Sequence, residues 1–557
     1  MRVGFWLLTS VSLAGIVFLS QEPKPASNPQ PDPAPILADA QIQYRKGSFD
    51  LAISRYNEVL KADAASGDAY AGIIRCYLKQ DKVQEADDTL RKALQVAPSY
   101  PDLKVAEGEL LFRQGEIPEA GRLFTEVIAA PPDPAQPNSR PNARAYLGAA
   151  RVAEASANYA REHILIARAH ALDDSDTDVR KMWIETLSTA DRIHSLEEYL
   201  AQATNDDEDA RRRLRDRLSF LKAVQSAEMG RCRPVSDITA TKTNLVAIPL
   251  GTGAQGASLG VRINGKPVKL LLDTGASGIV ISSKLAAETG LKSASNIQMG
   301  GIGDKPDAQA HIASANSVQI GEMEFRNCQL YIVDRVPKEA DGVIGTDVFS
   351  QFLIELDFPG WSMHLSRLPP RPGETESRPS LNAGEEDPAT EPEDKPAADS
   401  AVKQSPAVPK YEDRYLAPEM HSYIQIFRMG HMLLVPTTVN ESASKLFLLD
   451  TGAFDNTITP AAAREVTKVH RAPRIDVHGL NGEVGKVYVA DNVMVDFGHL
   501  RQQVPHMVSI DMTRVSRRAG TEISGTLGMA MLGLLKVRLD YRDGLADLKY
   551  VPKPVRH

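Results

Sequence analysis

Two kinds of hydrophobic pattern divide this chain. Between residues 36 and 225, apolar side chains recur at helical spacing in a stretch rich in Ala, Leu, Glu and Arg, which predicts amphipathic helices. In residues 240–368, and again in residues 420–552, short apolar runs bounded by turn residues are typical of β-strands. The sequence therefore predicts an all-α part followed by two β-rich segments.

A small residue and a bulky apolar residue recur together in the helical part. Ala52, Ala86 and Ala120 follow one another at intervals of 34 residues, and each is followed four positions later by Tyr, Leu or Phe. Pro98 and Pro132 keep the same interval. This period resembles that of the tetratricopeptide repeat, a pair of antiparallel helices. A small residue lets the two helices approach each other closely.

The repeat becomes less regular toward the end of the helical part. Residues 143–172 resemble a fourth copy, displaced by the Pro-rich insert 131–141, and residues 176–225 fit the repeat poorly. We interpret this last stretch as the cap of a solenoid of repeats, residues 36–225. Such an array either binds a peptide or a protein partner or serves as a spacer without a specific ligand. The sequence leaves both interpretations open.

Turn and linker signals subdivide the β-rich part. Asn264-Gly265 separates the apolar runs Leu259–Ile263 and Val268–Leu272, which predicts a β-hairpin. Residues 369–419 are poor in apolar side chains and rich in Pro, Glu, Asp, Ser and Ala. Because such a composition cannot bury a core, we predict a flexible linker between two β domains.

The N-terminus has the composition of an export segment. Residues 1–20 carry Arg2 as their only charge and are otherwise apolar or small. No Ala-x-Ala pattern precedes Gln21, so a cleaved signal peptide and a retained membrane anchor both remain open. Residues 21–35 are Pro-rich and predict a disordered tether. Both alternatives place the rest of the chain in the periplasm or outside the cell.

Composition narrows the classes of function. The net charge is −8 at pH 7, which argues against a nucleic-acid-binding protein. The three cysteines, Cys76, Cys232 and Cys328, lie far apart without metal-ligand spacing, and we interpret them as isolated core residues. Motifs for zinc, nucleoside triphosphates and dinucleotides are not found in the sequence. We therefore predict no metal and no cofactor.

The tetrapeptide Asp-Thr-Gly-Ala occurs once in each β-rich segment. It starts at Asp273 and at Asp450, directly after an apolar run. Three landmarks follow in the same order in both segments: a Gly-rich stretch, a short run ending in glycine, and an Asp flanked by Leu and an aromatic residue. From the glycine of the second landmark, Gly345 or Gly528, that Asp follows 12 residues later in both. The two segments are therefore copies of one fold.

Each copy resembles the retropepsin-like aspartic protease domain of retroviral proteases and their bacterial relatives. This resemblance implies all-β lobes that work in pairs, either within one chain, as in pepsin-like enzymes, or as a homodimer. After the tetrapeptide the copies diverge, with Ser277 in one and Phe454 in the other. This divergence favours an asymmetric pair within one chain. The expected protein is a tetratricopeptide-like solenoid followed by two retropepsin-like lobes.

The resemblance also implies a role for each matched residue. Asp273 and Asp450 would form a dyad that activates water for peptide hydrolysis, because two carboxylates about 3 Å apart share one proton. The other matched residues would support the active loops or form flaps that close over an extended peptide or protein substrate. The loop residues are Thr274, Gly275, Gly345, Thr451, Gly452 and Gly528. The flap residues are Gly301, Ile302, Gly303, Gly479 and Leu480.

Two functions from different classes follow from these features. The first is an exported aspartic endopeptidase. The alternative is a catalytically inactive scaffold that binds peptides through its repeats and its protease-like lobes. His478 beside the second flap is interpreted as an exposed hairpin residue without a role, with a substrate contact as the alternative.

Overall fold

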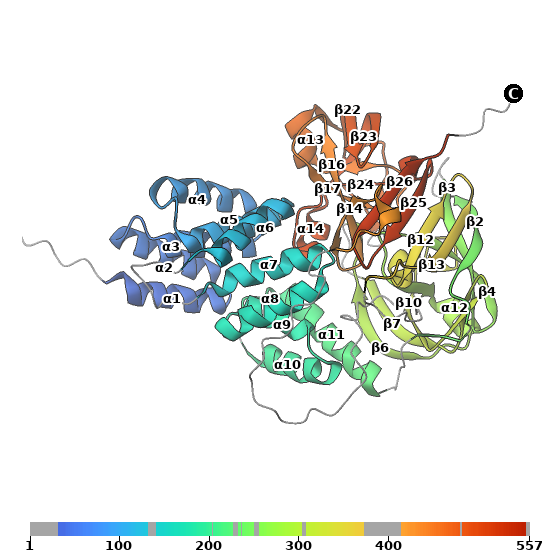
Figure 1. Ribbon diagram of the computed structural model, residues 1–557, viewed down its shortest axis with the longest axis horizontal. Coiled ribbons are helices and arrows are strands. Elements are labelled where there is room, and N and C mark those ends of the chain that lie inside the picture. Colours follow the sequence, from blue (N-terminus) through green and yellow to red (C-terminus); the bar gives the residue numbers. More distant parts are fainter. Residues whose placement is uncertain are drawn as a thin grey trace, which may run out of the picture.

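A helical array and two β lobes make up the molecule, and the predicted fold class is confirmed (Figure 1). The predicted export segment lies outside the part of the chain that the structure describes, as do most of the predicted tether and linker. No helix within the described part is long and apolar enough to cross a membrane. The computed structural model describes residues 32–131, 141–202, 204–226, 232–235, 237–249, 255–303, 308–372, 414–479 and 482–552.

The array consists, within the described residues, of five antiparallel helix pairs and one long final helix. It begins at Pro33, inside the predicted tether, because the Asp32 side chain accepts a hydrogen bond from the Ala34 amide and caps the first turn. Small residues permit close helix packing, since a Cβ at Gly108 or Gly148 would overlap the ring of Phe124. The helices are α1 (Pro33–Arg45), α2 (Phe49–Ala62), α3 (Gly67–Lys79), α4 (Val83–Val96), α5 (Pro101–Arg113), α6 (Ile117–Ala129), α7 (Ala143–Ala155), α8 (Tyr159–Leu172), α9 (Thr177–Glu185), α10 (Thr189–Ala201) and α11 (Glu208–Ser226).

Lobe 1 is a curled sheet with a short α-helix and a 3₁₀ turn among its described residues. Its predicted hairpin forms at Asn264 and Gly265, whose φ angles of 49° and 82° suit a tight turn. The elements are β1 (Arg233–Pro234), β2 (Thr241–Pro249), β3 (Gln255–Ile263), β4 (Lys266–Asp273), β5 (Ile279–Ser282), α12 (Ser283–Glu288), β6 (Ser293–Met299), β7 (Ala308–Ala315), β8 (Val318–Ile320), β9 (Met323–Arg326), β10 (Cys328–Val333), β11 (Gly342–Gly345), η1 (Thr346–Phe349), β12 (Phe352–Asp357) and β13 (Ser362–Arg367).

Lobe 2 repeats the central strands of lobe 1. In both lobes the run that ends in glycine forms a strand parallel to the one before the Asp-Thr-Gly motif, so that Gly345 pairs with Asp273 and Leu527 pairs with Leu449. The elements are η2 (Pro418–Met420), β14 (Ile424–Gln425), β15 (Phe427–Met429), β16 (Met432–Val439), β17 (Lys445–Leu449), β18 (Thr457–Ile458), α13 (Pro460–Val466), β19 (Val469–Arg471), β20 (His478–Gly479), β21 (Gly482–Glu483), β22 (Val487–Phe497), β23 (Leu500–Ile510), α14 (Thr513–Ala519), β24 (Gly525–Leu527), α15 (Met529–Leu532), β25 (Leu535–Asp540) and β26 (Leu545–Tyr550).

The two lobes pair within one chain through a shared sheet. Strand β12 of lobe 1 lies antiparallel to β25 of lobe 2, with Ile354 opposite Leu539. Glu355 accepts hydrogen bonds from Arg538 at 2.7 Å and Lys536 at 3.2 Å across this pairing. The Asp landmark at the end of each copy therefore belongs to the strand that joins the lobes.

Two predictions along the chain need correction. Cys232 and Cys328 form a disulfide and are not isolated core residues. Their sequence separation of 96 hid the pairing, which arises because β1 lies beside β9, the strand just before Cys328. Cys76 remains a free, buried thiol, as predicted. The second correction concerns the predicted linker, because its last residues, 414–419, lie against lobe 2, where the Tyr415 amide donates to Asp543 at 3.1 Å.

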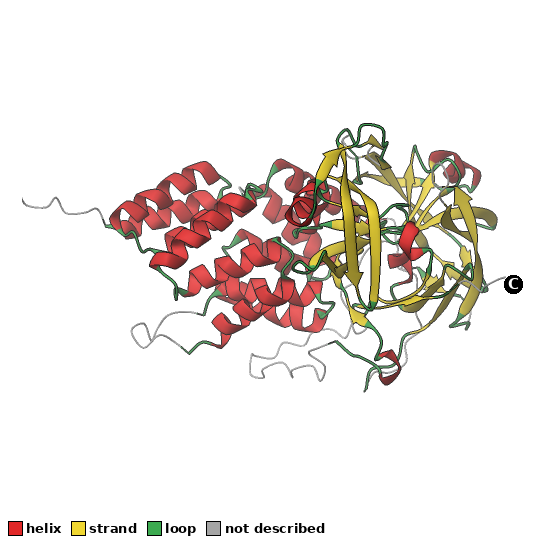
Figure 2. Cartoon of the chain, turned by 90° about the horizontal axis from the view of Figure 1, so that it is seen from above, coloured by secondary structure: helices red, strands yellow, loops and turns green. Residues whose placement is uncertain are grey.

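The array docks on both lobes (Figure 2). Tyr199 of α10 and Phe220 of α11 share a buried apolar cluster with Ile312 of β7 and Tyr331 of β10. On lobe 2, the Thr521 hydroxyl donates to the Phe112 carbonyl at 2.7 Å, at the end of α5. The Glu522 amide donates to the next carbonyl, that of Arg113, at 2.9 Å. The array therefore bridges the two lobes.

Candidate active site

The two Asp-Thr-Gly motifs meet between the lobes. Asp273 ends β4 and Asp450 directly follows β17. Their carboxyl groups come together beside Gly275, where a Cβ would lie 3.1 Å from Oδ1 of Asp450 and 3.3 Å from Oδ1 of Asp273. Each motif also binds its own carboxylate: the Gly275 amide donates to Asp273 at 2.8 Å and the Gly452 amide donates to Asp450 at 3.0 Å. Two tight turns therefore present two carboxyl groups to each other.

Burial and mutual repulsion favour one shared proton in this pair. Burial raises the pKa of both carboxyl groups, and the charge of Asp273 raises the pKa of Asp450 further. Amide donors act in the opposite direction, with the Ala453 amide donating to Asp450 at 2.9 Å. The pair therefore titrates as a unit, and neither member alone is the acid.

The threonines of the motifs cross-link the lobes beneath the dyad. The Thr274 amide donates to the Thr451 hydroxyl at 3.0 Å, and the Thr451 amide donates to the Thr274 hydroxyl at the same distance. Each hydroxyl in turn donates to a carbonyl of the opposite lobe, at 2.6 Å to Leu449 and at 2.9 Å to Leu272. This symmetric network is buried, so it fixes one active loop relative to the other.

The glycines of the motifs let each loop approach the opposite carboxylate. A Cβ at Gly452 would overlap the Asp273 carboxyl group, and one at Gly275 would lie 3.0 Å from Cγ of Asp450. The landmark glycines support these loops from the next strand. At Gly345 a Cβ would overlap the Ala276 carbonyl, and at Gly528 it would lie 2.7 Å from the Phe454 carbonyl.

A single cavity of about 2010 Å³ contains the dyad and most of the expected flap residues. Gly301 and Ile302 line it from the turn after β6, and Gly479 lines it from β20. The two flaps touch, because a Cβ at Gly479 would overlap the Ile302 carbonyl. The Gly303 carbonyl accepts a hydrogen bond from Arg514, and Leu480 lies outside the described residues. His478 is exposed and also lines the cavity.

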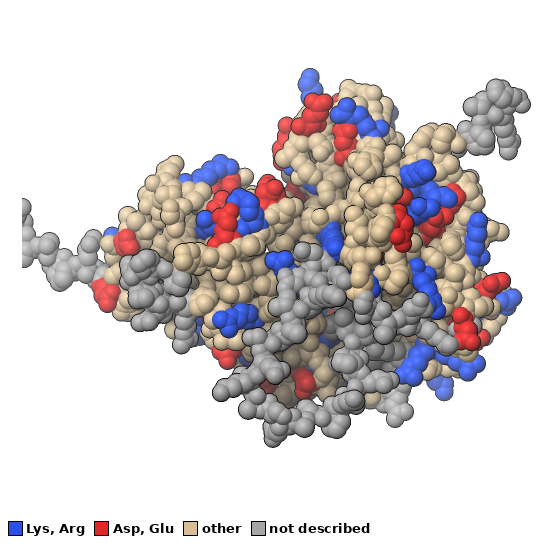
Figure 3. Space-filling view, in the orientation of Figure 1, with Lys and Arg blue, Asp and Glu red and all other residues tan. Residues whose placement is uncertain are grey.

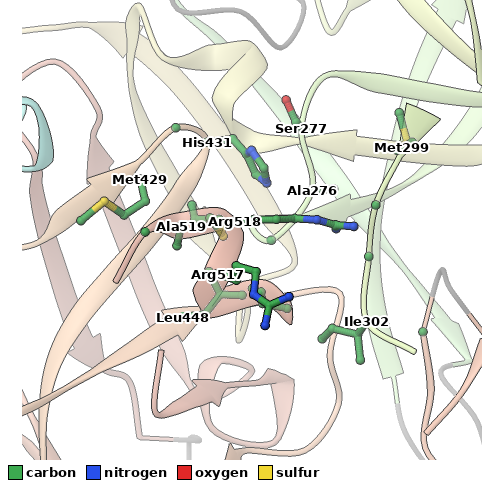
Figure 4. A pocket seen from close by; sticks show the side chains of 18 of the residues that line it. Ala276, Ser277, Met299, Ile302, Met429, His431, Leu448, Arg517, Arg518 and Ala519 are labelled. Carbon is green, nitrogen blue, oxygen red and sulfur yellow. The ribbon is translucent and has the colours of Figure 1, made fainter. Parts of the chain in front are cut away.

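The cavity holds charged residues that sequence reasoning missed (Figure 4). His431 lies at the turn between β15 and β16, and its charge lowers the pKa of Asp273, although burial is the larger effect. Arg517 and Arg518 enter from α14, and a Cβ at Gly300 in the first flap would overlap the Arg518 guanidinium. These residues carried no sequence signal, because they belong to no motif and come from separate elements.

A third carboxyl group, Asp347 in η1, braces the loop of Asp273. It accepts hydrogen bonds from the Ser277 hydroxyl at 2.9 Å and the Gly278 amide at 3.0 Å. Burial raises the pKa of Asp347 to about 6. Lobe 2 uses a different brace, with the Asn456 side chain accepting from the Gly528 amide at 2.8 Å. The divergence after the tetrapeptide therefore reflects two different loop supports.

Metal-ligating side chains do not gather in the described ranges. Among those residues, no group of three or more His, Cys, Asp or Glu side chains has the arrangement of a metal site.

Comparisons with known proteins agree with this architecture. The family model described as aspartyl protease matches residues 259–348 and residues 435–531, one match in each lobe. The family model described as tetratricopeptide repeat matches residues 37–103 and 78–134 of the array. No curated protein gives a significant match. A solved structure described as "Functional Characterization of Pseudomonas Aeruginosa pilF" is 17% identical, covers 35% of this chain and 86% of that chain, and has a TM-score of 0.23.

Proposed function

Because this chain joins tetratricopeptide repeats to two lobes of the aspartyl protease family, we propose that it is an exported aspartic endopeptidase. The observation that carries this proposal is the meeting of the Asp273 and Asp450 carboxyl groups between the lobes. The composition of residues 1–20 supports export.

The shared proton gives the pair both roles that peptide hydrolysis requires. The ionised carboxylate takes a proton from a water molecule, whose oxygen attacks the carbonyl carbon of the scissile peptide bond. The protonated carboxyl group donates to the carbonyl oxygen at the same time, so the developing negative charge is neutralised. The carboxyl group that took the proton from water then gives it to the leaving nitrogen as the C–N bond breaks. The other carboxylate takes a proton from a hydroxyl group of the intermediate, so the pair returns to its shared-proton state.

The shape and lining of the cavity suit an extended peptide. Apolar side chains from both lobes form its walls near the dyad, which favours substrates with apolar residues at the cleavage site. The flaps lie over the same cavity and exclude water when they close on a bound strand. The apolar wall residues are Val280, Ile297, Tyr331, Val343, Met432, Leu448, Val508 and Ile510.

Cleavage of a mixed peptide library tests this function. We expect the full chain to cut peptides at mildly acid to neutral pH, and a statine-type inhibitor to block the cut. Asp273→Asn and Asp450→Asn should each abolish turnover, because either change removes a carboxylate from the pair. Replacement of the exposed Asp209 on α11 by Asn is the matched control.

The same experiment decides against the proposal in two ways. Full activity in either dyad variant would show that hydrolysis does not depend on the pair. Peptide binding without hydrolysis at any pH, unchanged in both Asn variants, would instead establish an inactive peptide-binding protein.

A further inference from the structure

The candidate active site continues onto the inner face of the helical array. The cavity that holds the dyad is also lined by residues from six helices of the array and the segment before α11, among them Tyr44, Lys79, Phe112, Arg144 and Lys181. Its volume of about 2010 Å³ exceeds the roughly 300–1,000 Å³ of ordinary small-molecule pockets. A polymer that runs from the dyad onto the array is therefore the ligand that fits this space.

Two lysines line this cavity, and each forms an ion pair with a buried carboxylate. The Lys79 side chain is 24% exposed, whereas its ion-pair partner Asp178 is 2% exposed, with Nζ and Oδ1 2.5 Å apart. Lys181 is 31% exposed above Asp206, which is 1% exposed. Within the described residues each ammonium group makes one hydrogen bond, so its other donors are available to a ligand.

These lysines begin a row of cations that leads toward the dyad. The carboxylate partners of the two lysines lie close together, because Asn205, which precedes Asp206, donates to Asp178 at 3.4 Å. Two residues beyond Lys79, Asp81 forms an ion pair with Arg517 of α14 at 2.9 Å. Arg518, which follows Arg517 in α14, lies against Gly300 of the first flap. We name Lys181, Lys79, Arg517 and Arg518 the cationic track.

The track is a local feature of the cavity. Over the face shown in Figure 3, basic and acidic side chains are interspersed. Five exposed acids also line the cavity. Asp334, Asp455 and Asp476 belong to the lobes, whereas Glu154 and Asp207 belong to the array, where Arg151 and Arg213 line the cavity as well. The carboxylates that pair with the lysines are buried, so a ligand in the cavity meets the ammonium groups first.

We propose that the cationic track binds an acidic stretch of the substrate polypeptide that flanks its apolar cleavage site on one side. This inference rests on the proposed function, because it takes the ligand of the dyad to be a peptide. Carboxylates of such a stretch would accept hydrogen bonds from the lysines and arginines while the apolar residues occupy the walls around the dyad.

Binding of four synthetic peptides to the full chain tests the track. All four share one six-residue apolar centre and a fluorescent label. Two of them carry four Glu, one before the centre and the other after it. The third carries four Gln on both sides, and the fourth carries four Lys on both sides. Affinity is measured by fluorescence anisotropy with the Asp273→Asn chain, which does not consume the peptide. We expect one of the two Glu peptides to bind about ten-fold tighter than the Gln peptide or better, with the Lys peptide weakest.

Variants of the track separate charge from fold. Lys79→Gln combined with Lys181→Gln should lower the affinity of the Glu peptide to that of the Gln peptide, whereas Arg at both positions should preserve it. The fold should survive, because Asp178 still pairs with Arg144 at 3.0 Å and Asp206 still accepts from Tyr199 at 2.6 Å. Arg517→Gln, at an exposed position, tests the arginine end of the track in the same way and should also lower the affinity of the Glu peptide. Lys92→Gln, on an exposed surface of α4, should change nothing.

The outcomes distinguish this inference from the proposed function. Three outcomes would contradict the proposed role of the track. They are equal affinity for the Glu and Gln peptides, a preference for Glu that the lysine variants do not change, and no binding of any peptide. If the unmodified chain cleaves the Gln and Glu peptides with equal KM, the protease function stands and the track fails. If the Glu preference depends on the lysines but nothing is cleaved, the track stands and the protease function fails.

Discussion

Replacing Thr274 by Val removes one half of the buried cross-link between the lobes. Val has almost the same shape as Thr, so the main effect of the change is the loss of the hydrogen bonds that the hydroxyl makes. Two buried backbone groups then lose their partners: the Thr451 amide, 3.0 Å from the hydroxyl, and the Leu449 carbonyl, 2.6 Å from it. An unsatisfied buried group costs about 1–3 kcal/mol, so the loss is about 2–6 kcal/mol.

Hydrogen exchange detected by mass spectrometry measures this loss where it occurs. Peptides that cover the two active loops should exchange at least about 30-fold faster in the variant, because 2 kcal/mol corresponds to that factor. Peptides from α1 to α4 of the array should be unaffected. Turnover should fall as well, since the dyad carboxylates are held by these loops.

Two controls isolate the hydroxyl. Thr274→Ser keeps the hydrogen bonds and should retain most of the protection. Thr89→Val removes an exposed hydroxyl that donates to the Glu85 carbonyl within α4, and should change stability by no more than about 0.5 kcal/mol. Unchanged exchange of the active loops in Thr274→Val would refute the view that this network holds the lobes in register.

Three further predictions concern the loops and the disulfide. Gly452→Ala should reduce kcat at least about 100-fold without unfolding the lobes, because its Cβ overlaps the Asp273 carboxyl group, while Gly260→Ala, where nothing lies within 4 Å, should be neutral in the same peptidase assay. Burial raises the pKa of Asp347 to about 6, so the protonated carboxyl group contributes fully to the free energy of unfolding below about pH 4, and this contribution is lost as pH rises through 6. In urea denaturation, the free energy of unfolding of the wild type should fall by about 3 kcal/mol relative to that of Asp347→Asn over this range. Parallel pH profiles of the two proteins would contradict this. Alkylation of the denatured chain should label one thiol, that of Cys76, before reduction and three afterwards; three labelled thiols before reduction would contradict the disulfide.

How far sequence reasoning reaches here depends on whether a feature is local. The Asp-Thr-Gly motif and its turn use neighbouring residues, so the two lobes were predictable from the repetition alone. The hairpin at Asn264-Gly265 was predictable for the same reason. The disulfide was not, because its two cysteines come together only through the pairing of β1 with β9. The roles assigned to the dyad and the flaps remain predictions until activity is measured.

The charged residues of the cavity could not be predicted from the sequence either, because they come from elements that are far apart in the chain. Lys79 lies on α3 and Arg517 on α14, so no spacing rule relates them, although Asp81 joins their two elements in the folded chain. Their placement depends on how the array docks, through contacts such as Thr521 to the Phe112 carbonyl. Docking surfaces leave little periodic signal in a sequence. A site formed by two domains therefore cannot be predicted from the sequence pattern of either domain alone.

The docked array also makes the active site asymmetric. The two lobes present equivalent motifs to each other, and a site built from these alone would treat both sides of a substrate alike. The array breaks this equivalence, because it contacts the two lobes differently. Asp81 forms an ion pair with Arg517 of α14 in lobe 2, whereas the contact with lobe 1 is a buried apolar cluster that includes Tyr331. The helix in turn contacts the flap of lobe 1, through Arg514 to the Gly303 carbonyl at 3.0 Å. An acidic stretch should therefore promote binding on one side of the scissile bond and not on the other, which is why the two Glu peptides must be compared separately.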